Sequence, residues 1–83
     1  MFSINKWKVE GKVVGILEQK KGYWITIKGI AKNHSVFSSD AFDIKCWILK
    51  KNLKGQSIKS KMSFLGHFVI KKDDCYFIAE DVV

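Results

Sequence analysis

Apolar and polar side chains alternate with a period of two along much of the chain, and this pattern predicts β-strands. The clearest alternation covers residues 23–28, with the sequence YWITIK. One face of this strand carries a tyrosine and two isoleucines and is a core face. The opposite face carries Trp24, Thr26 and Lys28. A tryptophan on the polar face of a strand is harder to explain than a buried one.

Residues 41–48 form a second predicted strand with the same arrangement. Alternation directs an apolar set toward the core: Phe42, Ile44, Cys46 and Ile48. It directs Asp43, Lys45 and Trp47 outward. If the two strands are neighbours in one sheet, their outer faces present two flat aromatic rings among lysines. Such a surface suits nucleobases stacked on the rings and phosphates beside the ammonium groups.

The first predicted strand begins at Lys6 and contains a change of phase. Its early inward positions are Trp7, Val9, Gly11 and Val13. After them, Val14 and Ile16 become the apolar set. A phase change beside Gly11 and Gly15 is typical of a long strand that bulges or bends to serve two sheets. Residues 19–22 follow as a turn, in which Gly22 is suited to a positive φ.

Residues 32–40 are polar and aperiodic and are predicted to form a loop. Phe37 stands out in this loop, and two roles are open for it. It either folds back to plug the core or clamps a base as a mobile ring.

The second half of the chain predicts two more strands. Residues 49–56 form one helical turn or a loop ended by Gly55. A strand over residues 57–66 then directs apolar side chains inward, and its outward lysines are Lys59 and Lys61. It continues past a glycine bend through residues 67–70, and a fifth strand covers residues 75–83. Five strands, glycine bends and no proline predict a small closed barrel, with an SH3-like barrel as the alternative.

Length and composition favour one folded domain, residues 1–83, because 47% of the chain is hydrophobic and 13% is aromatic. Fifteen basic residues, all lysine, against eight acidic ones give a net charge of +7. The positive charge precedes Asp73, since the last strand is acidic. This balance favours a polyanionic partner, with nucleic acid ahead of an anionic membrane surface. A merely lysine-rich soluble surface is the alternative.

Cysteine and histidine positions give little support to catalysis. Cys46 and Cys75 lie apart in apolar contexts and are predicted to be buried, reduced thiols. His34 and His67 are isolated, and the chain has no glycine-rich phosphate loop, so neither an enzyme nor a cofactor or metal site is expected. The chain shows no signal peptide and no long apolar span, which predicts a cytoplasmic protein without a membrane partner.

Several segments carry a family resemblance. Residues 9–13 (VEGKV) are similar to a glycine-containing first strand, and residues 22–27 (GYWITI) to a second strand on which aromatic and basic side chains meet bases. Residues 53–58 (LKGQSI), 64–66 (FLG) and 74–80 (DCYFIAE) resemble a run of lysine-glycine, strand, glycine, acidic turn, aromatic and alanine-glutamate. These features resemble the OB-fold single-stranded DNA-binding proteins of bacteria and phages. Without the acidic tail of the cellular members, the likeness is to a minimal phage, plasmid or primosomal-replication relative.

The resemblance implies a five-stranded Greek-key OB-fold barrel that binds single-stranded nucleic acid, DNA ahead of RNA, with little sequence preference. Trp24 and Trp47 would stack on bases. The other expected binding residues are Thr26, Lys28, Lys45, Lys59, Lys61, Lys12, Phe37 and Phe68, the last at the base of a hairpin that OB-folds use as a gripping arm. A homodimer or higher homo-oligomer is also expected. The alternative is a protein-interaction module in which the outward tryptophans form an oligomer or partner interface.

Overall fold

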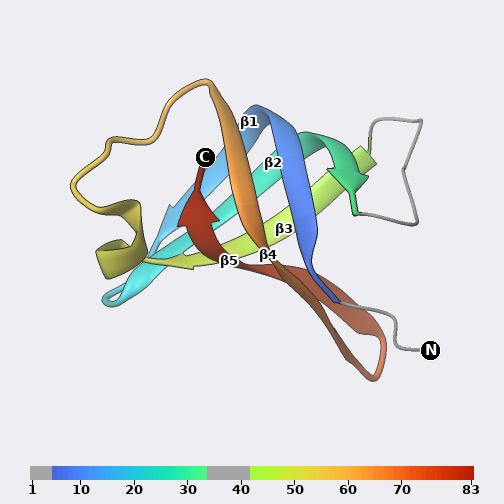
Figure 1. Ribbon diagram of the computed structural model, residues 1–83. Helices are drawn as coiled ribbons and strands as arrows, with labels where there is room; N and C mark the ends of the chain where they lie inside the picture. The colour runs from blue at the N-terminus through green and yellow to red at the C-terminus, as the bar shows by residue number, and fades with distance from the viewer. Residues whose placement is uncertain (1–4, 34–41) are drawn as a thin grey trace.

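The alternating stretches of the sequence form five strands in the computed structural model, which describes residues 5–33 and 42–83. In chain order the elements are β1 (Trp7–Glu18), β2 (Gly22–Lys32), β3 (Phe42–Leu49), the 3-10 helix η1 (Lys50–Leu53), β4 (Lys61–Lys71) and β5 (Asp74–Val82). The strands follow one another in the order β1-β2-β3-β5-β4, and β4 returns to β1 to close a barrel (Figure 1).

The directions of pairing define the topology. β3 and β5 run parallel, whereas the four other pairs are antiparallel. The β4–β5 hairpin closes the barrel by placing β5 beside β3 and β4 beside β1. This is the Greek-key connectivity of an OB-fold-like barrel. The predicted fold class is therefore confirmed, including the one helical turn between β3 and β4.

The core is built from the inward positions of all five strands and from one leucine of η1, each of them at most 6% exposed. Its members are Val9, Ile25, Ile27, Ala31, Ile44, Cys46, Ile48, Leu53, Met62, Phe64, Phe77 and Ala79. Burial in this apolar set raises the pKa of the Cys46 thiol to about 12, because a thiolate there would lose its hydration. Cys46 is therefore a neutral packing residue, as predicted.

β1 is shared by two neighbours and bends strongly along its length (Figure 1). Its pairing with β4 ends at Lys12, and its register with β2 shifts between Val13 and Gly15, which confirms the predicted bulge. Val14 and Ile16, predicted to become the apolar set after the phase change, are not covered by the barrel and are 51% and 54% exposed. Beyond the bulge, β1 pairs with β2 but no longer with β4, so these side chains lie on an edge strand. This part of β1 and the paired part of β2, which also pairs with β3, are together termed the β1–β2 arm.

Three predictions are wrong near the ends of strands. Phe42 is 42% exposed, because β5 pairs with β3 only over Cys46–Ile48 and does not reach the start of β3. Cys75 is exposed, since it lies in the β4–β5 hairpin where that hairpin extends beyond the barrel (Figure 1). Gly22 lacks a positive φ. It is buried in the sheet instead, where a Cβ would collide with the carbonyl oxygen of Ile48.

η1 and the segment after it connect β3 to β4. Lys54 (φ 53°) and Gly55 (φ 79°) adopt left-handed backbone and end η1, in agreement with the predicted stop at Gly55. β4 begins at Lys61 and not at residue 57. The carbonyl oxygen of Ser60 nevertheless accepts a 2.8 Å hydrogen bond from the backbone N–H of Val13, so the connection is tied to β1 just before the bulge.

Candidate functional site

Three aromatic rings gather on the outer face of β2, β3 and β5. Trp24 and Trp47 are directly opposite each other in the β2–β3 pair, with ring centroids 5.1 Å apart and planes tilted by 48°. Tyr76 of β5 makes an edge contact with Trp24 at 5.5 Å. These three residues are termed the aromatic cluster. Each is only partly buried, so ring surface stays open to a ligand.

Local sequence and strand order position these rings. Gly22 makes room for Trp47, because a Cβ at Gly22 would lie 3.0 Å from two carbons of the indole. β5 brings Tyr76 to the cluster because it runs parallel to β3. In this pairing Trp47 is opposite Ile78, which lies two residues after Tyr76 on the same face of β5. The cluster therefore depends on residues that are far apart in the sequence.

Lysines surround the aromatic cluster. Lys45 Nζ lies 4.6 Å from the ring centroid of Trp24, a cation–π contact worth about 0.5 to 1 kcal/mol at an exposed position. Thr26 is opposite Lys45 in the β2–β3 register. At the other end of the cluster, Lys20 and Lys21 of the β1–β2 turn line a hollow together with the rings. Phosphates next to a stacked base would meet positive charge on both sides.

Trp24 stands between two hollows of the surface. One is bounded by Trp47, Tyr76 and the lysines of the β1–β2 turn. The other is bounded by Thr26 and by Leu17, which is opposite Trp24 in the β1–β2 pair and 58% exposed. Flat ligands therefore have access to this indole from two directions.

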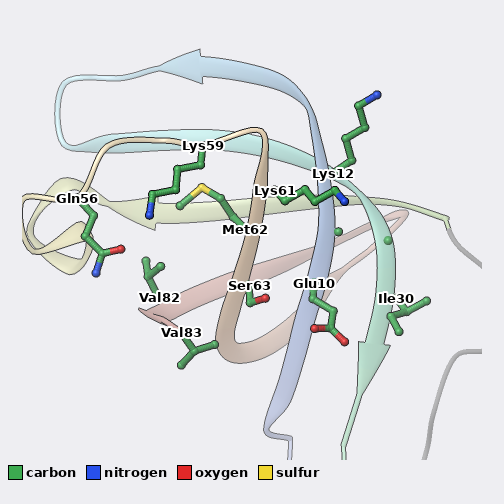
Figure 2. Close-up of a pocket in the computed structure, with 12 residues that line it drawn as sticks. Glu10, Lys12, Ile30, Gln56, Lys59, Lys61, Met62, Ser63, Val82 and Val83 are labelled. Carbon is green, nitrogen blue, oxygen red and sulfur yellow. The ribbon is translucent and has the colours of Figure 1, made fainter.

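Three other predicted binding residues form a row across neighbouring strands. Lys28 of β2 is opposite Lys12 of β1, and Lys12 is opposite Lys61 of β4. These are termed the lysine row. Figure 2 shows Lys12 and Lys61 on their adjacent strands and Lys59 further along the same hollow. Lys28 follows Thr26 by two residues on the same outer face of β2, so the row begins beside the aromatic cluster.

One aromatic residue predicted to bind, Phe68, does not join this surface. Phe68 packs against Phe77 of the core at 5.0 Å and against Trp7 at 5.4 Å, so it supports the base of the β4–β5 hairpin. Trp7, predicted as a core residue, is half-buried in this packing. Phe37 lies outside the described residues.

Sequence reasoning missed part of the site. The sequence predicts Tyr76 and Ile78 only as members of the fifth strand, and Lys20 and Lys21 only as members of a turn. The alternation of residues 75–79 does contain a signal, since Phe77 and Ala79 are inward and their neighbours Tyr76 and Ile78 must face out. The missing information was the parallel pairing of β3 with β5, which alternation alone does not reveal.

In residues 5–33 and 42–83, no three His, Cys, Asp or Glu side chains gather in a way that could hold a metal ion. Within the same ranges, no helix is long and apolar enough to cross a membrane. Comparisons of the chain with family models, with curated proteins and with solved structures find no match. The likeness to single-stranded DNA-binding proteins therefore stays a prediction made from the residues.

Proposed function

We propose that the protein binds single-stranded nucleic acid, with DNA ahead of RNA and with little sequence preference. The observation that carries this proposal is the paired Trp24 and Trp47 on an open sheet face, 5.1 Å apart and bordered by lysines. Stacking tolerates any base, because every base has a π-face, and lysines read only the phosphates. Neither contact distinguishes one sequence from another.

The contribution of the tryptophans is testable by alanine substitution. Trp24→Ala and Trp47→Ala are each expected to weaken binding of a labelled oligo-dT by roughly 5- to 150-fold, which corresponds to about 1 to 3 kcal/mol per stacked base. Fluorescence anisotropy measures the affinity, and oligo-U measured alongside decides between DNA and RNA.

Leu65→Ala is the matched control for these variants. Leu65 is also an outward apolar side chain, 41% exposed, but it lies on β4 opposite Lys8 of β1 and Asp81 of β5, away from the aromatic cluster. Its truncation is expected to leave the affinity unchanged. Equal affinities of the two tryptophan variants and the control would contradict the proposal.

A protein-interaction module is the second candidate, and one observation favours it. Val14, Ile16 and Leu17 of the β1–β2 arm are each more than half exposed, and Leu17 is adjacent to Trp24. Exposed apolar side chains of this kind suit an interface with a second copy or a partner. Under this reading, Leu17→Ser lowers the molecular mass measured in solution, and oligo-dT does not bind.

A further inference from the structure

The lysine row is an unfavourable arrangement for the free protein. Lys12 has a lysine directly opposite on each side, Lys28 on β2 and Lys61 on β4, and all three side chains are exposed. Like charges directly opposite each other in a sheet are destabilising. Among the described residues, none of the three lysines makes an ion pair.

Four acidic side chains of the barrel are engaged away from the row. Glu10 pairs with Lys32 at 2.6 Å, and that hydrogen bond lowers the pKa of the Glu10 carboxyl. Other carboxylates pair outside the row as well: Glu18 with Lys50, Asp81 with Lys54 and Glu80 with His67. In the described part of the chain, Asp43 is opposite Lys28 without an ion pair, whereas Lys12 and Lys61 have no carboxylate opposite them in the sheet. The positive charge of Lys12 and Lys61 is thus left for a partner outside the chain.

The neighbours of the row indicate the direction in which a polyanion would cross it. Asp43 is opposite Lys28 on β3 and would repel a phosphate at that end. Lys12 and Lys61 continue the row away from Asp43, toward β4. A phosphate backbone that passes Lys45 and reaches Lys28 therefore meets attraction only on the side of β1 and β4.

Beyond Lys61 the surface is hollowed. Lys59, Lys61 and Lys12 line this hollow together with the polar side chains of Gln56 and Ser63 (Figure 2). Amide and hydroxyl groups can hydrogen-bond phosphate or base edges, and the lysines supply the charge. Glu10 also borders the hollow, but Lys32 holds its carboxylate.

From this continuity we infer that a bound strand does not stay on the outer face of β2 and β3. It leaves the aromatic cluster over Lys28, crosses β1 and β4 over Lys12 and Lys61, and ends in the hollow beside Lys59. The inference rests on the proposed function and adds the course of the strand. It assigns stacking to one end of the site and phosphate contacts to the other.

Oligonucleotides of different lengths distinguish the stacking end of the site from the phosphate-contact end. A strand of about 4 nucleotides occupies the aromatic cluster alone, whereas one of about 12 reaches the lysine row, since single OB domains cover roughly 4 to 16 nucleotides. In the double variant Lys12→Gln with Lys61→Gln, the slope of log K against log salt is expected to become less negative by about 1.4 for the longer strand, because each single-strand phosphate contact contributes about −0.7. For the short strand the slope stays the same.

The control double variant is Lys6→Gln with Lys51→Gln, which removes the same charge from exposed positions outside the row. Its slope is expected to match the wild type for both lengths. If the two double variants behave alike while the short strand still binds, the crossing path is wrong and the proposed function stands. If the short strand does not bind the wild type, both are wrong.

Discussion

The Trp24 ring is held by neighbours on both sides of β2 and does not pack into the hydrophobic core. Trp47, Tyr76 and Lys45 all contact its ring, and Leu17 lies opposite it on β1. Alternation predicted from the sequence that this tryptophan faces outward. It could not predict the partial burial of the ring, because Tyr76 belongs to a strand whose pairing partner only the fold defines.

The two cysteines illustrate the same limit, since their apolar sequence contexts look alike. Cys46 is buried with a pKa raised to about 12, whereas Cys75 is exposed. At pH 8 an aromatic disulfide reagent is expected to label one thiol per folded chain quickly and the second only after denaturation. The variant Cys75→Ser is the control and should remove the fast phase. Fast labelling of both thiols in the folded protein would contradict the buried position of Cys46.

The raised pKa of Cys46 also predicts how the free energy of unfolding depends on pH. The unfolded thiol loses its proton near its ordinary pKa of 9.0, while the folded thiol keeps its proton until about pH 12. The unfolded state therefore binds fewer protons between these values, and the free energy of unfolding falls as pH rises through this window. Urea unfolding at pH 8 and pH 10 measures the loss, which Cys46→Ala should reduce.

The sequence predicts the number of strands and which side chains share a face of each strand. It does not predict which of these faces other strands cover. The phase change in β1 correctly indicated the bulge between Val13 and Gly15. Burial beyond the bulge was not predictable, because alternation reports which side chains share a face and not whether another strand covers that face. β4 stops pairing at Lys12, and so Val14 and Ile16 remain exposed.

Two glycines of the β1–β2 arm differ in how closely they are packed. A Cβ at Gly22 would collide with the Ile48 carbonyl oxygen and press on Trp47, whereas at Gly15 the nearest atoms belong to Thr26 at 3.5 Å. Gly22→Ala is therefore expected to destabilise the fold by about 1 to 3 kcal/mol through overpacking. Gly15→Ala, its control, should change stability much less. Urea denaturation measures both, and equal stabilities would contradict the close packing at Gly22.

Across the whole barrel, only some of the described lysines are neutralised by carboxylates of the chain. Lys32, Lys50 and Lys54 are paired with carboxylates, while the lysine row, like the other described lysines, has no ion pair among the described residues. The net charge of +7 predicted a polyanionic partner in general terms. Which lysines serve it depends on cross-strand register, and that was not readable from a sequence in which Lys12, Lys28 and Lys61 are far apart.

Base stacking on the aromatic cluster is the central claim, and the intrinsic fluorescence of Trp24 and Trp47 reports on it most directly. The variant Trp7→Phe removes the one other tryptophan, which packs against Phe68 away from the cluster. Oligo-dT is expected to quench the remaining fluorescence, and more weakly at about 200 mM than at about 50 mM salt. Inorganic polyphosphate, which has charge but no bases, should compete without quenching. Fluorescence that oligo-dT leaves unchanged would contradict the claim.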